Sequence, residues 1–199
     1  MVLLDPVSAL RRGRPVVLFD EDVIEGGAEL LIAAEVAQSD AMAFLVRYTS
    51  GFVTVALPVR RCNQLDLPAI AADPYGGCRP VPAVTVDAAE GIGTGISAAD
   101  RSCTARLLAD PATRPDQLSR PGHLVPLRVP EPGPGPLTTP QVALALCEQS
   151  GRQPGVVRCE LVHDDGPLMS AVDAVAFALE HGLAIVSAQD IPLRAVTAA

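Results

Sequence analysis

The stretch from Val84 to Asp110 (VTVDAAEGIGTGISAADRSCTARLLAD) constrains the fold more than any other segment of the chain. Its first residues alternate apolar and polar side chains, which is typical of a half-buried strand. A turn around Thr94 follows, and it contains Gly91, Gly93 and Gly95. Ser97 and Asp100 have the spacing of a capping box, so we expect a helix over 98–108. A strand, a glycine turn and a capped helix can hold an anionic ligand, but such turns are also common without that function.

The same alternation of strand and helix signals runs through the rest of the chain. Apolar runs at 16–19 and 156–162 predict strands. Thr139 is predicted to cap a helix that has Pro140 at its first position. Ser170 and Asp173 form a second capping box. These signals predict a single α/β domain over residues 1–199, with a mixed sheet flanked by helices.

Composition excludes several classes of function. All 15 basic residues are arginine, so there is no lysine for a Schiff base or a pyridoxal phosphate anchor, and we expect no organic cofactor. The net charge of −8 argues against nucleic acid or an anionic membrane as a partner. A small-molecule substrate is the remaining expectation.

The cysteines and the apolar runs bear on location. The five cysteines are odd in number and scattered, without a Cys-x-x-Cys pair, which is typical of reduced thiols in a cytoplasmic protein. No apolar run reaches membrane-spanning length, and the first residues do not have the pattern of a signal peptide. We therefore expect a cytoplasmic protein with no membrane segment.

Residues 20–29 (DEDVIEGGAE) hold five carboxylates within ten positions. Like charges at this density repel one another unless water solvates them or a cation is shared between them. The segment is therefore either a solvated loop or a site for a hard cation such as Mg²⁺, with Glu25 as a ligand.

Four strings along the chain are distinctive, namely Thr85–Gly91 (TVDAAEG), Thr94–Arg101 (TGISAADR), Arg120–His123 (RPGH) and Cys159–Val162 (CELV). They resemble the 3,4-dihydroxy-2-butanone 4-phosphate synthase family, and the resemblance covers nearly the whole chain. Enzymes of that family convert ribulose 5-phosphate to a four-carbon ketone phosphate and formate. The resemblance implies a three-layer-like domain, a homodimer with active sites at the subunit interface, and Mg²⁺.

The resemblance also assigns roles to individual residues. It implies metal binding by Glu25 and catalysis by Glu25, His123 and Glu160. It implies substrate binding by Asp20, Thr94, Glu29 and Arg120.

Two of these roles also have support from the residues themselves. The imidazole of His123 can exchange a proton near neutral pH. A carboxylate in an apolar run, as at Glu160, must find a partner or its pKa will rise. The alternative is that Glu160 is simply paired with an arginine such as Arg158 or Arg120.

The chain departs from the family pattern at positions that matter for chemistry. Ile24, Gly27 and Thr139 stand where the similar enzymes have Arg, Glu and a metal-binding His, and no basic residue lies between Arg128 and Arg152. These departures predict weak Mg²⁺ binding, because one expected ligand is missing.

Three hypotheses follow. The first is a diverged lyase or isomerase that enolises a sugar phosphate or a related hydroxy-ketone, with the standard activity weakened or lost. The second is a functional synthase. The third is a non-catalytic dimeric relative that serves as a binding or partner subunit.

Overall fold

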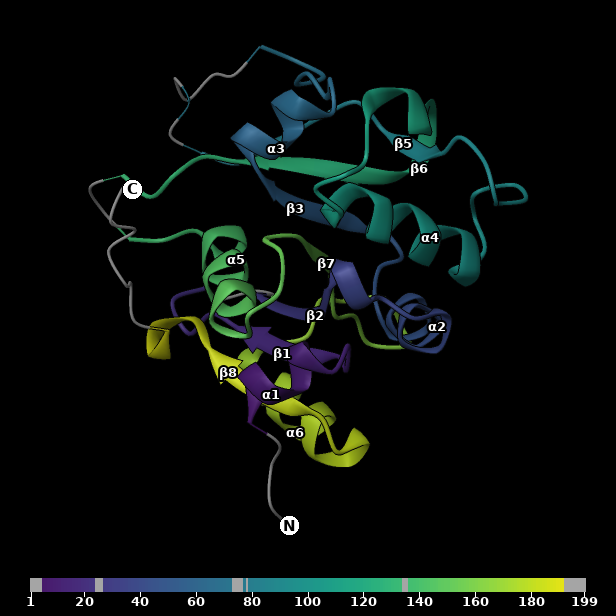
Figure 1. Cartoon of the computed structure of the whole chain (residues 1–199). Coiled ribbons are helices and arrows are strands. Elements are labelled where there is room, and N and C mark those ends of the chain that lie inside the picture. The colour runs from purple at the N-terminus through teal and green to yellow at the C-terminus, as the bar shows by residue number, and fades with distance from the viewer. Residues whose placement is uncertain (1–4, 24–26, 73–76, 78, 134–135, 192–199) are drawn as a thin grey trace.

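The computed structural model describes residues 5–23, 27–72, 77, 79–133 and 136–191. Within these residues eight strands form one sheet in the order β4-β6-β3-β7-β2-β1-β8, and β5 pairs with β6 beside this path (Figure 1). The strands are β1 (Val16–Phe19), β2 (Ala28–Ala33), β3 (Thr54–Pro58), β4 (Val81–Pro82), β5 (Val86–Ala88), β6 (Leu118–Val129), β7 (Val156–Glu160) and β8 (Ala184–Ser187).

The sheet is mixed, as the sequence predicts. Strand β1 is parallel to β8 and β3 is parallel to β6, while the other pairs are antiparallel. Every residue of β2 is buried, which explains why this segment is an almost unbroken apolar run. The one charged side chain in that run is Glu29, which becomes important below.

Helices cover both faces of the sheet and give three layers (Figure 1). On one face, α2, α4 and α6 bury apolar side chains, and on the other face α1 and α5 do so. The helices are α1 (Pro6–Arg11), α2 (Ser39–Tyr48), α3 (Val59–Gln64), α4 (Ala98–Ala109), α5 (Thr139–Gln149) and α6 (Ala171–His181), with short 3-10 turns at Ala34–Val36, Pro115–Gln117 and Ala188–Asp190. The predicted α/β class with a mixed sheet between helices is confirmed.

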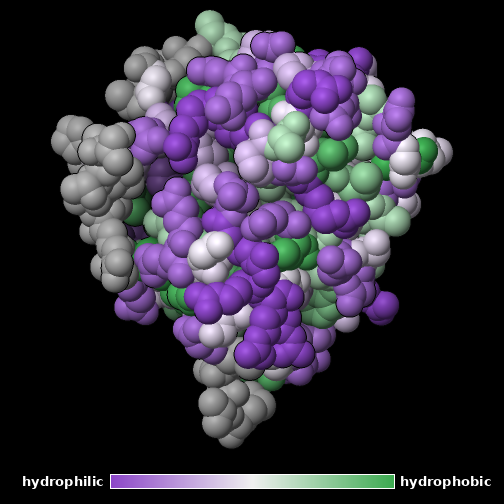
Figure 2. All heavy atoms as spheres, viewed as in Figure 1, coloured by the Kyte–Doolittle hydropathy of each residue, from purple (hydrophilic) through white to green (hydrophobic). Residues whose placement is uncertain are grey.

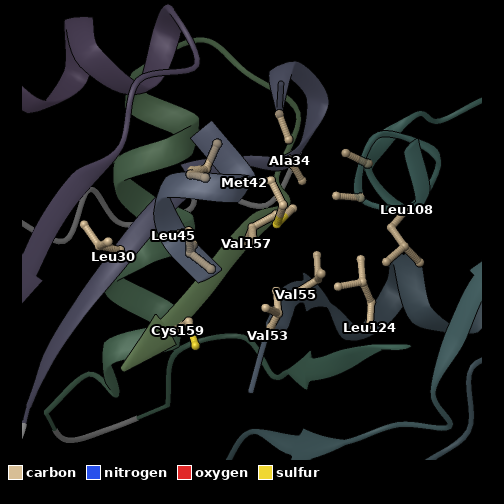
Figure 3. Packing of buried hydrophobic residues seen from close by; sticks show 14 of the residues in the cluster. Leu30, Ala34, Met42, Leu45, Val53, Val55, Leu108, Leu124, Val157 and Cys159 are labelled. Carbon is tan, nitrogen blue, oxygen red and sulfur yellow. The ribbon is translucent and has the colours of Figure 1, made fainter. Parts of the chain in front are cut away.

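The larger of the two cores lies between the sheet and helices α2 and α4 (Figure 3). Met42 and Leu45 of α2 and Leu108 of α4 are fully buried against strand residues such as Val55 and Val157. With aromatic residues at 3% of the chain, aliphatic side chains supply nearly all of this apolar burial. The core therefore fixes α4 against the sheet, and α4 in turn fixes the glycine turn that precedes it.

Two predicted helix starts are confirmed by their capping contacts. The Ser97 hydroxyl accepts a hydrogen bond from the Asp100 amide at 3.1 Å. Ser170 and Asp173 form the reciprocal contacts of a capping box, and α6 ends at the left-handed Gly182 (φ 61°).

The predicted cap at Thr139 is wrong by one residue. Thr138 is the N-cap of α5, and its amide donates to Gln141 Oε1 at 2.9 Å. Thr138 and Gln141 have the three-residue spacing that a capping box needs, so this pair satisfies backbone amides at the N-terminus of the helix. Thr139 is the first helical residue, and its hydroxyl is therefore available for another partner.

The cysteines behave as packing residues. The described cysteines, Cys62, Cys103, Cys147 and Cys159, form no disulfide, and Cys78 lies outside the described residues. Burial raises the pKa of Cys62 and of Cys147 to about 11, so neither thiol ionises readily near neutral pH.

Among the described helices, none has both the length and the apolar character needed to cross a bilayer. The molecular face drawn in Figure 2 is mainly hydrophilic, with hydrophobic residues in scattered small groups.

Candidate active site

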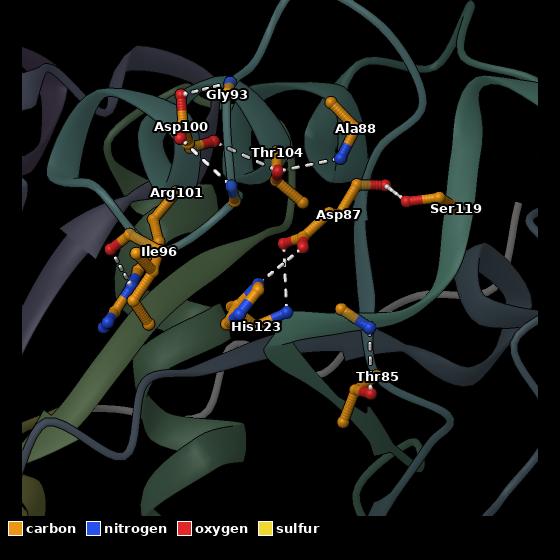
Figure 4. Close-up of polar contacts among 12 residues, drawn as sticks. Thr85, Asp87, Ala88, Gly93, Ile96, Asp100, Arg101, Thr104, Ser119 and His123 are labelled. Atoms are coloured by element: carbon orange, nitrogen blue, oxygen red, sulfur yellow. Dashed lines mark hydrogen bonds and ion pairs between the residues drawn. The ribbon is translucent and has the colours of Figure 1, made fainter.

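The first half of the site is a dyad formed by Asp87 and His123 (Figure 4). His123 Nδ1 lies 2.6 Å from Asp87 Oδ2, and the His123 amide donates to Asp87 Oδ1 at 3.0 Å. The Asp87 side chain is 8% exposed and the His123 side chain 41%. In a neutral imidazole beside an ionised Asp87, Nδ1 is the donor and Nε2 keeps a free lone pair, because an ionised carboxylate only accepts. The dyad can therefore act as an oriented base.

Two glycines allow the dyad to form. A Cβ at Gly122 would lie 1.9 Å from the Val86 carbonyl carbon, so β5 and β6 could not approach with any larger residue there. A Cβ at Gly95 would lie 2.1 Å from Asp87 Oδ2 and 2.7 Å from His123 Nδ1. Gly95 also has a φ of +85°, which a side-chain-bearing residue rarely adopts. The glycine turn is therefore packed directly against the dyad.

Asp100 holds this turn in place (Figure 4). Its carboxylate accepts hydrogen bonds from the Gly93 amide at 3.2 Å and the Gly95 amide at 3.1 Å. The bond from Gly93 is the main cause of the lowered pKa of Asp100. Thr94, between the two glycines, is exposed and directly precedes Gly95, which packs against the dyad. Its predicted contact with substrate is therefore consistent with its position and stays a prediction.

The second half of the site is a carboxylate cluster made of Glu29, Thr139, Arg158 and Glu160. Arg158 Nε donates to Glu29 Oε2 at 2.6 Å, and Nη2 also contacts Oε1. Thr139 Oγ1 donates to Glu29 Oε1 at 3.2 Å. The side chains of Arg158 and Glu29 are only 12% and 3% exposed. Glu29, predicted to bind substrate, is thus held by two protein donors.

Glu160 lies directly beside Glu29 on the neighbouring strand, because the two are register partners in β7 and β2. Its Oε2 is buried, with no hydrogen-bond partner among the described residues. Burial is the main cause that raises the pKa of Glu160 to about 7, and the charge of Glu29 adds to it while Arg158 opposes it. The expected rise in pKa is confirmed. Glu160 is consequently present in both protonation states near neutral pH.

The simple pairing of Glu160 with Arg158 or Arg120 is not what the structure shows. Arg158 gives its hydrogen bonds to Glu29 because the antiparallel register of β2 and β7 brings that carboxylate within reach. Arg120 donates to backbone carbonyl oxygens, namely those of Leu65 at 2.7 Å, Leu118 at 3.0 Å and Pro115 at 3.2 Å. These are the contacts of a structural residue, and the predicted binding of substrate by Arg120 stays a prediction.

The sheet register relates the dyad to the cluster. Thr54 of β3 pairs with Val125 of β6 on one side and with Arg158 of β7 on the other. His123 precedes Val125 by two residues, and Glu160 follows Arg158 by two on an antiparallel strand. His123 and Glu160 therefore lie at the same end of the sheet, two strands apart, with about 10 Å between their backbones.

The remaining predicted residues lie in the acidic segment. Asp20 Oδ1 accepts from Gln189 Nε2 at 2.8 Å and from the Asp22 amide at 3.0 Å. Glu25 lies outside the described residues, as does Ile24. The roles predicted for Asp20 and Glu25 stay predictions.

Asp87 is the functional candidate that the sequence reading missed. Its signal was available, because it occupies an inward position of the strand in the TVDA string and is a charged residue with only 6% exposure. A buried carboxylate requires a partner, and His123, which follows Gly122, is a residue that can supply one.

The donor set of the carboxylate cluster does not fit Mg²⁺. Hard cations need carboxylate oxygens with free lone pairs directed at the ion. Both oxygens of Glu29 already contact the Arg158 guanidinium, and that positive charge lies beside any ion placed there. Among the described side chains, no group of three or more His, Cys, Asp or Glu residues is placed to hold a metal.

A large hollow in the described structure lies elsewhere. It has a volume of about 1020 Å³ and lies beside α3, β4 and β6, with Val59, Leu67, Val81 and Arg128 among its lining residues. No residue of the dyad or of the carboxylate cluster lines it.

The fold and the paired site residues define a class of protein. The family model for 3,4-dihydroxy-2-butanone 4-phosphate synthase matches residues 5–192, so the chain belongs to this family of lyases. The riboflavin biosynthesis protein RibBA of Salinispora tropica is 45% identical over 186 residues, and that of Mycobacterium tuberculosis is 40% identical over 194 residues.

Solved structures of the family agree with the fold. The 3,4-dihydroxy-2-butanone 4-phosphate synthase of Candida albicans has a TM-score of 0.82 and 39% identity, over 92% of each chain. A synthase described in complex with two magnesium ions has a TM-score of 0.83 and 33% identity, over 94% of this chain and 92% of that one.

The chain is about half as long as the RibBA relatives that it matches. The alignments cover 93% of this chain but only 46% of the S. tropica protein and 44% of the M. tuberculosis protein. What those longer proteins do as a whole is therefore not transferred to this chain directly.

Proposed function

We propose that this chain is a functional 3,4-dihydroxy-2-butanone 4-phosphate synthase, which converts ribulose 5-phosphate to the four-carbon ketone phosphate and formate. Family membership and 45% identity to a riboflavin biosynthesis protein support this reaction class. The observation that carries the proposal is the dyad, which presents one imidazole nitrogen beside the exposed Thr94 turn.

The dyad would begin the reaction by enolisation. His123 Nε2 removes a proton from carbon next to the substrate carbonyl, and an enediolate forms. Asp87 holds the imidazole in the tautomer that leaves Nε2 free, and it stabilises the imidazolium that results. Thr94 would contact a substrate hydroxyl, because its own hydroxyl is exposed at the tip of the turn.

Glu160 would serve the dehydration that follows. A carboxylic acid with a pKa of about 7 is protonated often enough at neutral pH to give its proton to a leaving hydroxyl. The buried position of its Oε2 limits competition from water. Asp20, at the end of β1, would bind another hydroxyl of the sugar.

The test is formate release from ribulose 5-phosphate, compared between the wild type, His123→Gln and His163→Gln. His163 is the matched control because it also pairs with an aspartate, with Nε2 3.4 Å from Asp173 Oδ2, but that aspartate belongs to α6 and not to β5. We expect roughly a 10³-fold loss for His123→Gln, in the range typical of a lost acid–base group. Wild-type protein that releases no formate above the enzyme-free blank would contradict the proposal.

A diverged lyase acting on a related hydroxy-ketone is a second candidate. It is favoured by the start of α5, where Thr139 bonds Glu29 and no basic residue lies between Arg128 and Arg152 to bind a phosphate. Such an enzyme would turn over ribulose as well as ribulose 5-phosphate. Comparing kcat/KM for the two sugars separates the candidates, because a phosphate-binding site gives a strong preference for the phosphorylated sugar.

Two further points belong to the proposal. We infer a homodimer, as the family resemblance implies, and light scattering at micromolar concentration tests it. We also infer that any Mg²⁺ binds through Glu25 and water, which makes its binding weak. A non-catalytic partner subunit is excluded as soon as turnover is measured.

A further inference from the structure

The carboxylate cluster contains a cation of its own. Arg158 and Glu29 come from neighbouring antiparallel strands, and Leu31 is the register partner of Arg158, so Glu29 lies one pleat away on the same face. The guanidinium contacts both Glu29 oxygens, with Nε to Oε2 at 2.6 Å. This forked geometry is the strongest arrangement available between an arginine and a carboxylate.

Thr139 completes the cage around Glu29. Its hydroxyl donates to Oε1 at 3.2 Å and lies 3.4 Å from Arg158 Nη2. Since Thr138 takes the capping role, nothing in α5 competes for the Thr139 hydroxyl. Glu29 therefore has both of its oxygens engaged while being 2% exposed.

Charge counting explains what this cage does for Glu160. The charged groups that act on Glu160 are Glu29 on β2 and Arg158 on its own strand. Arg158 neutralises Glu29, so the cluster is neutral only while Glu160 carries a proton. A divalent ion between the two glutamates would be repelled by the guanidinium and would have to compete with a hydrogen bond at each oxygen of Glu29.

We propose that the Arg158 guanidinium is the resident cation of this cluster, which takes the place of a divalent metal between Glu29 and Glu160 and closes that position to Mg²⁺. Arg158 is accordingly a positioning residue, since it acts through Glu29 and Glu160. The inference concerns metal binding and does not rest on the proposed lyase activity.

The test uses Mn²⁺ as a paramagnetic probe of divalent binding, with bound and free ion separated by electron paramagnetic resonance. Arg158→Met removes the charge at similar length and leaves two carboxylates facing each other. We expect it to bind Mn²⁺ roughly tenfold or more tightly than the wild type, and the added Glu29→Gln change should abolish the gain. Equal binding by the wild type and Arg158→Met would overturn the proposal.

A second comparison does not depend on the folding of Arg158→Met. Glu29→Gln alone should leave the wild-type affinity for Mn²⁺ unchanged within about twofold, because Glu29 is not a metal ligand in the presence of Arg158. A loss of roughly tenfold or more in this variant would show that Glu29 binds the metal and would overturn the proposal. Arg158→Lys keeps the positive charge and should show no gain, which separates the effect of charge from that of size.

Discussion

The dyad and the carboxylate cluster lie at the same end of the sheet but are built in different ways. The dyad is shaped by backbone: two glycines permit it, and amide hydrogen bonds to Asp87 and Asp100 fix its geometry. The cluster is shaped by side-chain charge, with the Arg158 guanidinium bonded to buried Glu29 on β2 and to Thr139 at the start of α5. The half-exposed dyad is suited to chemistry, whereas the buried cluster couples charge to folding. Changes in the cluster should therefore affect stability most, and changes at the dyad should affect activity most.

The largest stability effect is expected from Arg158→Met. Removing one member of a buried ion pair leaves Glu29 uncompensated, which typically costs about 3–5 kcal/mol. Urea unfolding followed by circular dichroism measures it. The double variant Glu29→Gln/Arg158→Met should recover a large part of the loss, because no charge is then left unpaired. Additive effects of the two changes would break the account of the cluster.

The next effect sharpens the other side of the comparison. Gly95→Ala would push a methyl group into Asp87 and His123, and we expect about a 10²-fold loss of kcat, as for a misplaced catalytic group. Gly91→Ala is the matched control, since Gly91 also has a positive φ (+77°) but no atom within 4 Å of its Cβ position. In both variants an alanine must adopt a positive φ, which costs about 1 kcal/mol of stability. Similar activities for the two would show that the contact with the dyad is unimportant.

Glu160 links folding to pH. Its folded-state pKa is raised to about 7 from the ordinary value of 4.5, so the folded state binds the proton more tightly than the unfolded state. The stability it contributes is full below pH 4.5 and is lost as pH rises to about 7 and above. After allowance for its partial exposure to solvent, we expect roughly 2 kcal/mol over this range.

Comparison with Glu160→Gln isolates that contribution. The variant has no proton to lose at this position, so the unfolding free energy of the wild type should fall relative to that of the variant as pH rises. A difference that is constant from pH 4.5 to 7.5 would contradict the raised pKa.

The contrast between the two regions also explains what sequence could predict. The strand at 16–19 and the helix starts at Ser97 and Ser170 depend on neighbouring residues, and all three are as predicted. The pair of Glu29 and Arg158 spans 129 positions and depends on the register of β2 and β7, which no local pattern specifies. The capping error at Thr139 had a different, local origin, since two adjacent threonines compete and the three-residue spacing to Gln141 selects Thr138.

The smallest effect concerns the scaffold of the dyad. Ser97→Ala removes the cap of α4 and should cost about 1 kcal/mol of stability. Activity per folded molecule should change little, because Asp100 still bonds the amides of Gly93 and Gly95. Thermal unfolding and formate release on the same sample measure both quantities.

The central claim is that the dyad, oriented by Asp87, performs the first proton transfer. It is tested most directly by incubating ribulose 5-phosphate in deuterium oxide and following, by NMR, the exchange of the proton next to the carbonyl. We expect proton exchange with the wild type and an exchange rate lower by roughly 10²-fold or more with both His123→Gln and Asp87→Asn. The first variant has no imidazole to accept the proton. In the second, the introduced amide no longer fixes the required tautomer of His123. Exchange by His123→Gln at the wild-type rate would contradict the claim.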